Sequence, residues 1–382
     1  MKKPLLLILT IVISLLAGCS TMNSNTDKSI NNAPVLENLT YDHSMELKYA
    51  NNFSVDYYVG GYALISLSNE SRFLVVPEDM KVPEGLGDDI SVLQQPISNI
   101  YLVASATMSH FVALDALEAI RLSGTDADNW YIEKAAEAMK AGNILYAGKY
   151  SAPDYELILN EKCNLTIQSE MINHSPEIIE KLEELGLTVL IDESSYESHP
   201  LGRMEWIKLY SVLVDKEVVA EKLFNEQAVV IDKLSHSKNT GKTVAFFYVT
   251  SNGSISARNT NDYVAKMINM AGGNYIFDNL GMDTVRSTTT MPMEDFYATA
   301  KNADYIIYNS SITGTMESID QLLELNELFA DFKAVQDGNV WCTNQNLYQE
   351  TNELGSMVGE INTIITTRDT TLTELKHFYK VQ

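Results

Sequence analysis

The sequence is short of positive charge. Its 27 lysines and arginines stand against 51 aspartates and glutamates, which gives a formal net charge of −24. A protein that binds nucleic acid needs a basic face for its phosphate contacts, so this composition argues against nucleic acid as a partner. A large net charge of one sign instead favours a soluble, exposed protein. Arginine is especially scarce, at positions 72, 121, 203, 258, 286 and 368.

Catalytic motifs are also missing. The sequence contains no HExxH motif, no GxSxG elbow, no phosphate-binding P-loop and no nucleotide-binding glycine pattern. Nothing in it favours a catalytic triad assembled from distant residues. We therefore predict that the protein is not an enzyme and has no intrinsic cofactor.

The N-terminus carries the longest apolar run. Lys2 and Lys3 precede an almost unbroken apolar stretch over residues 5–16, and Ala17, Gly18 and Cys19 follow at once. This stretch is shorter than a typical membrane-spanning helix. The lysines before it and the small residues after it are typical of a secretory signal. A cysteine at the cut site supplies a thiol for diacylation, and two acyl chains make a durable anchor. We predict a lipoprotein signal peptide over 1–18 and a lipidated Cys19 that holds the exported protein on the outer face of the cell membrane. The alternative is an ordinary cleaved signal with a chance cysteine.

A polar segment follows the signal peptide, and the two remaining cysteines lie far beyond it in the chain. Residues 19–45 are rich in serine, asparagine and threonine, and their apolar side chains have no period, which predicts a flexible tether. Cys163 and Cys342 each lie beside a β-rich segment. A disulfide between them is open to an exported protein. We expect two free, buried thiols instead, because they fall in different lobes and a bridge would lock those lobes together.

Strands and helices alternate twice along the chain, which is typical of α/β domains. We expect an N-terminal α/β lobe over 46–199, which opens with a β pattern over 53–76. Strands are then predicted at 100–104, 143–147, 164–168 and 188–191, and helices at 109–122, 130–140, 153–159 and 175–185.

The centre of the chain is helical, and the alternation then restarts. Residues 200–238 form the expected linker, with helices at 203–214 and 216–237 and Asp215 placed to cap the second. At roughly 22 residues, about 33 Å, the second helix is long enough to run along two domains. A C-terminal α/β lobe is expected over 239–382. Its strands are predicted at 243–250, 254–257, 305–308 and 339–343, and its helices at 262–271, 294–302, 319–332 and 355–366.

Short motifs recur in a fixed order in both lobes. They are Pro153-Asp154-Tyr155-Glu156 with Cys163-Asn164-Leu165-Thr166-Ile167, then LEELGLTV at 182–189, Met270-Ala271-Gly272-Gly273, and Met293-Glu294 with Asn302-Ala303-Asp304-Tyr305-Ile306-Ile307. With this set, the chain from about Glu46 onward resembles the ferric-siderophore, haem and cobalamin class of periplasmic binding proteins, the solute-binding components of ABC importers. The motifs depart from that class by lacking its prolines, for example at Cys163 and Thr188.

The resemblance implies an architecture and a set of partners. It implies two α/β lobes bridged by one long helix, with a ligand cleft between them, and a monomer that delivers its cargo to an ABC permease dimer with its ATPase. It also implies one exposed glutamate per lobe that docks into permease arginines, and Glu156 and Glu294 occupy the matching places. The alternative for each is an acidic residue that complements the dipole of its helix.

Ligand contacts are expected where strand ends converge between the lobes. Those loops include residues 105–108, 169–171 and 194–196. Tyrosine and methionine suit a large, partly apolar ligand, and arginine pairs with anionic oxygens. The predicted ligand-binding residues are Met108, Tyr150, Met171, Tyr248, Arg258 and Tyr348. For Arg258, a surface ion pair with Asp262 is an equally good interpretation of the sequence. Glu197 and Arg203 are interpreted as structural partners at the hinge.

The cargo implied by the resemblance is an iron-siderophore-type complex, with a cobamide or haem as alternatives. Scarce arginine weakens the case for a highly anionic catecholate and leaves room for hydroxamate chelates or corrinoids. A direct zinc or manganese protein is a further alternative, which requires about three histidines and a carboxylate from both lobes. His110, His174 and His199 all fall in the first lobe, and only His174 is near a strand-end loop.

Overall fold

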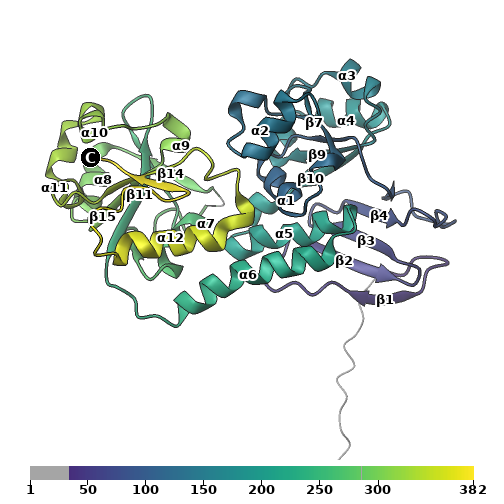
Figure 1. The fold of residues 1–382 in the computed structure, drawn as a ribbon, viewed down its shortest axis with the longest axis horizontal. Coiled ribbons are helices and arrows are strands. Elements are labelled where there is room, and N and C mark those ends of the chain that lie inside the picture. Colours follow the sequence, from purple (N-terminus) through teal and green to yellow (C-terminus); the bar gives the residue numbers. More distant parts are fainter. Residues whose placement is uncertain (1–33, 285) are drawn as a thin grey trace, which may run out of the picture. The chain divides into compact units, whose positions relative to one another are not determined.

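The computed structural model describes residues 34–284 and 286–382. Val35–Gln382 form one compact unit, in which Figure 1 shows two α/β lobes. The predicted signal peptide and Cys19 lie outside the described residues. No described helix is both long enough and apolar enough to cross a bilayer.

The N-terminal lobe begins with a five-stranded sheet in the order β1-β2-β3-β4-β5. Its strands are β1 (Tyr41–Ser44), β2 (Phe53–Tyr58), β3 (Tyr62–Leu67), β4 (Arg72–Val76) and β5 (Ile90–Gln94). The pairs are antiparallel except β4–β5. Alternate residues face two cores: Val55 and Ile65 face the main core, whereas Leu64 packs with Leu36. The β pattern predicted over 53–76 is confirmed.

The tether predicted over residues 19–45 overlaps the folded lobe, and residues 19–33 lie outside the described residues. Strand β1, assigned to the tether, pairs with β2, and Leu36 is buried. The prediction of a tether that reaches residue 45 is therefore wrong from about residue 35 onward. The strand was missed because its side chains are mostly exposed and carry no apolar alternation.

A second, parallel sheet completes this lobe in the order β10-β9-β6-β7-β8. Its strands are β6 (Ile100–Leu102), β7 (Ile120–Ser123), β8 (Leu145–Tyr146), β9 (Leu165–Ser169) and β10 (Thr188–Asp192). The lobe's helices are α1 (Met108–Ala113), α2 (Glu133–Lys140), α3 (Tyr155–Asn160) and α4 (Pro176–Glu184). The chain runs from β6 to β8 on one side and then returns to β9 and β10 on the other. The strand order therefore reverses between β6 and β9, where open α/β sheets bind ligands.

One predicted helix of this lobe is wrong in its second half. The apolar stripe over 109–122 predicts a single helix, but α1 ends at Ala113 and β7 begins at Ile120. Asp115 adopts a left-handed backbone, with φ of 51°, which an α-helix does not accommodate. Ile120 and Leu122 are buried on either side of half-buried Arg121, so the same apolar residues fit a strand.

Two consecutive helices form the linker, α5 (Pro200–Leu213) and α6 (Glu217–Ser235). At 19 residues, α6 is about 28 Å long. Asp215 does not cap α6 as predicted. It has φ of 56°, and its carboxylate accepts a hydrogen bond from Gln95 at 3.3 Å. The N-cap is Lys216.

The C-terminal lobe is built on a mixed sheet in the order β14-β12-β11-β15-β16-β17, with β13 also paired to β11. Its strands are β11 (Thr243–Val249), β12 (Ile255–Arg258), β13 (Asn274–Tyr275), β14 (Thr288–Met291), β15 (Tyr305–Tyr308), β16 (Val340–Thr343) and β17 (Phe378–Lys380). Its helices are α7 (Tyr263–Met270), α8 (Met293–Ala300), α9 (Ser310–Thr313), α10 (Ile319–Leu325), α11 (Lys333–Gln336) and α12 (Leu354–Thr366). The helix predicted over 319–332 ends at Leu325 and is followed by a 3₁₀ segment, Glu327–Asp331.

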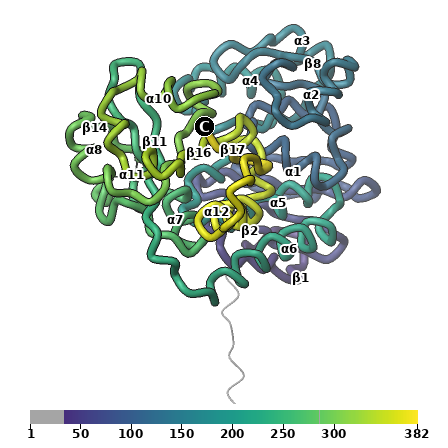
Figure 2. Tube along the Cα trace, turned by 60° about the vertical axis from the view of Figure 1, so that its left-hand side comes forward, coloured from purple at the N-terminus to yellow at the C-terminus, as the bar shows by residue number. Residues whose placement is uncertain are grey.

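Helix α12 joins this lobe to the linker. It packs on α5, α6 and α7, and Figures 1 and 2 both show it beside the linker helices. The approach to α6 requires a glycine, because a Cβ on Gly355 would lie 2.4 Å from the carbonyl oxygen of Gln227. The side chain of Gln227 also accepts the N–H of Ser356 at 2.8 Å. Helix α6 of the linker is therefore fixed to the C-terminal lobe by packing and by hydrogen bonds.

Candidate ligand-binding cleft

Two adjoining cavities lie where the lobes meet, with volumes of about 450 and 280 Å³. They share Glu170, Ser195, Arg203, Tyr263 and Tyr348. The first two residues belong to the N-terminal lobe, Arg203 to α5, and the two tyrosines to the C-terminal lobe. Together these cavities are called the cleft. Its remaining lining residues are Ala104, Ser105, Ala106, Ser169, Met171, Asp192, Ser194, Tyr196, Arg258, Ser287, Ile312 and Thr351.

Strand ends supply most of the cleft wall. In the parallel sheet, residues 104–106 follow β6. Ser169 is the last residue of β9 and Asp192 the last residue of β10, and the residues that follow each of them, up to 171 and 196, also contribute to the wall. In the other lobe, Arg258 ends β12, Ile312 lies after β15, and Tyr348 lies after β16. The cleft thus lies at the carboxyl edge of the parallel sheet, where the sequence predicts ligand contacts. The strand order of the sheet reverses at the same place.

Arg258 lines the cleft and is neutralised within the protein. Its guanidinium donates a hydrogen bond to the hydroxyl of Tyr348 and lies 3.6 Å from the carboxylate of buried Asp262. Burial lowers the pKa of Arg258, but Tyr348 and Asp262 more than offset this effect and raise it overall. The ion pair that the sequence left as an alternative is therefore present, and it is buried rather than on the surface.

Arg203 also lines both cavities, which the sequence interpretation missed. Its Nε donates to the carbonyl oxygen of Glu197 at 2.9 Å, and an Nη donates to the carbonyl oxygen of Ser195. The carboxylate of Glu197 instead accepts the N–H groups of Asn51 and Asn52, each at 2.8 Å. Glu197 is thus a structural residue of the hinge as predicted, whereas Arg203 is not confined to that role.

A buried polar network closes the floor of the cleft. Asp192 accepts hydrogen bonds from the hydroxyls of Thr107 and Tyr210 and from the N–H of Ser194. His110 stacks on Tyr210. Burial lowers the pKa of His110 to about 4, despite an opposing effect of Asp192. His110 is therefore neutral and lies behind the wall rather than in it.

One segment of the C-terminal lobe reaches across to the N-terminal lobe. The side-chain amide of Gln349 accepts the N–H of Tyr131 at 2.8 Å and donates to the carbonyl oxygen of Asn129 at 2.8 Å. The hydroxyl of Thr351 donates to the carbonyl oxygen of Ala106 at 2.8 Å. These contacts are called the clasp. They hold the lobes together beside the cleft residue Tyr348.

The structure separates the six predicted ligand residues into two groups. Met171, Arg258 and Tyr348 line the cleft. Tyr150 and Tyr248 are half-buried and pack on hydrophobic cores instead. A ligand contact for Met108 is not supported, because its side chain is fully buried. The chain turns through a 3₁₀ segment, Ser105–Thr107, before α1, which directs Met108 into the core.

Glu156 and Glu294 occupy equivalent places in the two lobes. Each is exposed and lies in the first turn of its helix, α3 and α8 respectively. Helix α3 is capped by Asp154, whose side chain accepts the N–H of Leu157, so Glu156 is not needed as the cap. The geometry leaves both carboxylates available to a partner.

The described histidines give no metal site in the cleft. None of them lines either cavity. One cluster elsewhere, Glu350, Glu353 and His377, brings potential ligand atoms within 4.8 Å of one another. Its atoms already have partners, however, since Lys376 bonds both glutamates and His377 lies between Glu350 and Glu360. We interpret this cluster as structural.

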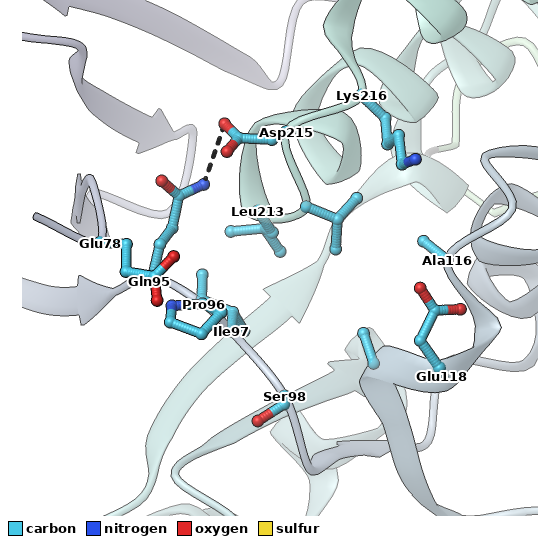
Figure 3. Close-up of a pocket in the computed structure, with 12 residues that line it drawn as sticks. Glu78, Gln95, Pro96, Ile97, Ser98, Ala116, Glu118, Leu213, Asp215 and Lys216 are labelled. Carbon is cyan, nitrogen blue, oxygen red and sulfur yellow. Dashed lines mark hydrogen bonds between the residues drawn. The ribbon is translucent and has the colours of Figure 1, made fainter.

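A further pocket, of about 290 Å³, lies on the N-terminal lobe at the turn between α5 and α6. Figure 3 shows Gln95 bonded to Asp215 on one side of it and Glu118 on the other. Its floor is apolar, with Pro96 and Leu213. Residues of the C-terminal lobe do not contribute to it, so it is not the inter-lobe cleft.

Both described cysteines are free and buried, as predicted. Cys163 precedes β9 in the N-terminal lobe, and Cys342 lies in β16 of the C-terminal lobe. Burial raises the pKa of each thiol to about 12. Neither is therefore a reactive thiolate at neutral pH.

Comparison with known proteins agrees with this architecture. Residues 103–347 match the family model described as periplasmic binding protein. An uncharacterized lipoprotein of Methanocaldococcus jannaschii is 28% identical, over 91% of this chain and 89% of its own length. A second uncharacterized lipoprotein of that organism is 26% identical, over 79% of this chain and 78% of its own.

Solved structures show the same fold. The periplasmic haem-binding protein HutB of Vibrio cholerae aligns with a TM-score of 0.59 at 16% identity, covering 71% of this chain and 99% of its own. The petrobactin-binding protein YclQ of Bacillus subtilis aligns with a TM-score of 0.57 at 14% identity, covering 71% and 93%. With the family model spanning both lobes and the cleft between them, the chain belongs to the periplasmic binding protein family.

Proposed function

We propose that the protein is the lipid-anchored solute-binding component of an ABC importer, which captures an iron-siderophore-type complex and delivers it to a membrane permease. The observation that carries this proposal is the cleft. It is formed by both lobes and lies at the strand-order reversal. A binding protein needs such a cleft and nothing more, because the chemistry of transport belongs to the permease and its ATPase.

The cleft walls suit a medium-sized ligand with both apolar and polar groups. Tyr196, Met171 and Ile312 are exposed to 59%, 42% and 53%, which is unusual for large apolar side chains. The guanidinium and hydroxyl groups beside them provide directional contacts. Haem and petrobactin are named as ligands of two proteins with this fold, which supports the chelate class. A haem or a cobamide is the alternative cargo.

A direct zinc or manganese site is not proposed. Such a site requires histidine or thiolate ligands. His110 is buried behind the cleft, and neither His174 nor His199 lines it among the described residues. A metal is therefore expected to enter the cleft inside a chelate.

Docking to the permease is assigned to Glu156 and Glu294. Their exposure on matching helices of separate lobes supports this proposal. Opposite charges at the rim of a transient interface steer and orient the partners. One contact on each lobe defines the orientation of the cleft over the transport path.

Native mass spectrometry of protein purified from rich medium tests the proposed cargo. A retained species with the mass and visible absorption of an iron chelate supports the main proposal, and a corrinoid or haem spectrum selects the alternative. Bare divalent zinc or manganese retained after desalting would contradict both.

A further inference from the structure

The half-buried arginines of this protein have carboxylate partners, with one exception. Arg72, Arg121 and Arg258 lie 2.8, 2.7 and 3.6 Å from the carboxylates of Asp89, Glu161 and Asp262. Arg203 is also half-buried, but it forms no ion pair with any described residue. This is unexpected, since acidic residues outnumber basic ones 51 to 27.

The guanidinium of Arg203 is held in a fixed orientation. Every other residue of α5 is buried, so Arg203 is the point where this helix reaches the cleft. Two carbonyl oxygens accept its N–H groups, and its central carbon lies 3.8 Å from the centre of the Tyr263 ring. A guanidinium has five N–H donors, so about three remain free.

The other charged groups of the cleft do not neutralise Arg203. Arg258 is paired with Asp262. Asp192 already accepts hydrogen bonds from Thr107, Tyr210 and Ser194. Glu170 lines both cavities, but it is not within ion-pair distance of Arg203. Arg203 is thus a preorganised positive charge that faces the cavity and has no anion of its own.

We infer that Arg203 binds a carboxylate group of an anionic metal chelate. A planar guanidinium recognises a carboxylate through paired N–H donors, and a ligand carboxylate would replace the water lost when the cleft fills. The inference rests on the proposed function and narrows its cargo. It favours chelates with free carboxylates, such as ferric citrate-type complexes or haem with its propionates, over uncharged ferric trihydroxamates and cobalamin, which have no free carboxylate.

Binding of two pairs of probes tests this assignment. Ferric citrate and haemin carry carboxylates, whereas ferrichrome and cyanocobalamin do not. Calorimetry with the wild-type protein is expected to show binding of a carboxylate probe. The Arg203→Gln variant should bind that probe about tenfold or more weakly, since a charge-assisted hydrogen bond is lost. Arg203→Lys should retain part of the affinity, and Glu170→Gln should strengthen binding by removing a nearby negative charge.

Arg121→Gln is the matched control, because Arg121 is a half-buried arginine that lines neither cavity of the cleft. Circular dichroism establishes whether each variant folds. If Arg203→Gln does not fold, Glu170→Gln still tests whether the charge of the cleft affects binding of a carboxylate probe. Wild-type binding of ferrichrome or cyanocobalamin alone, unchanged in Arg203→Gln, would overturn this inference and leave the proposed function intact. Binding of metal-free citrate but of no chelate would support the binding of a carboxylate by Arg203 and would overturn the proposed cargo. Binding of none of these compounds would overturn both.

Discussion

Gln349 pairs with the main chain on both sides of Trp130, accepting the N–H of Tyr131 and donating to the carbonyl oxygen of Asn129. Gln349 belongs to the C-terminal lobe, whereas Asn129 and Tyr131 both belong to the N-terminal lobe. The preceding residue, Tyr348, lines the cleft and accepts a hydrogen bond from Arg258. One short segment therefore both lines the cleft and joins the two lobes.

Gln349→Ala is expected to loosen the clasp. Two neutral hydrogen bonds are lost, and each contributes about 0.5–1.5 kcal/mol. The amide of Tyr131 should then exchange hydrogen faster, while amides of the two sheets keep their rates. Gln336→Ala is the control, because Gln336 is exposed and bonds only within its own lobe. Unchanged exchange at Tyr131 would show that the hydrogen bonds of Gln349 do not hold the lobes together.

The second prediction concerns His377, which is fully buried between Glu350 and Glu360 at 2.9 and 3.0 Å. Burial lowers the pKa of His377, but hydrogen bonds to the two glutamates outweigh this effect and raise it above the usual value. The pKa of Glu350 is lowered, because bonds to His377 and Lys376 outweigh its own burial.

The sign of the pH dependence follows from these directions. A raised histidine pKa stabilises the fold fully below the unfolded value of about 6.5, and this contribution is lost as pH rises through the folded pKa. The contribution of Glu350 is present above its unfolded pKa and is lost as pH falls through the lowered folded value. His377→Gln should therefore lower the free energy of unfolding most near pH 6, by about 3 kcal/mol for a broken buried pair. The loss should become smaller as pH rises.

Denaturant unfolding of wild type and His377→Gln across pH 5–9 measures this difference. His174→Gln is the control, since His174 is exposed. A difference in unfolding free energy that stays constant or grows with pH would contradict a charged His377.

Much of the fold could be predicted from the sequence because its central strands are apolar and separated by turn residues. Strand β15 was predicted with its observed bounds, and β9–β11 and β16 within two residues. Strands β1, β5, β14 and β17 were missed, since short edge strands are defined by distant pairing partners rather than by their own pattern. Residues 117–122 were assigned to a helix because Ile120 and Leu122 satisfy both helical and strand spacing.

The cleft could be predicted only where a strand leads into it. Residues 169–171 and 194–196 were expected there because carboxyl ends of parallel strands share one edge. Arg203 and Tyr263 enter from helices whose packing across the lobes leaves no local signal. Met108 was misassigned for the related reason that a single 3₁₀ turn decides whether the residue after a strand faces the cavity or the core.

The third prediction concerns the anchor. Cys19→Ser should abolish labelling by radioactive fatty acid and move the protein from the membrane to the soluble fraction, because acylation requires the thiol and each buried CH₂ contributes about 0.8 kcal/mol to membrane binding. Cys342→Ser is the control, since that thiol is buried in the fold. A Cys19→Ser protein that stays on the membrane to the wild-type extent would contradict the proposed anchor.

The last prediction separates cargo binding from delivery. Glu156 and Glu294 are exposed in the first turns of α3 and α8, and neither lines the cleft. Reversing both charges (Glu156→Lys, Glu294→Lys) should leave the affinity of the purified protein for its retained cargo nearly unchanged. Uptake by cells should fall sharply, because each proposed attraction to a permease arginine would become a repulsion that costs up to several kcal/mol.

A matched double variant distinguishes this effect from a general change of surface charge. Glu180→Lys with Glu324→Lys makes the same reversals at exposed glutamates of α4 and α10, one in each lobe. It should transport like wild type if position matters and total charge does not. All variants should remain folded, since exposed substitutions usually change stability by less than about 1 kcal/mol. Uptake that survives reversal of Glu156 and Glu294 would remove these residues from the docking site, and lost cargo affinity in the folded protein would place them in the cleft instead.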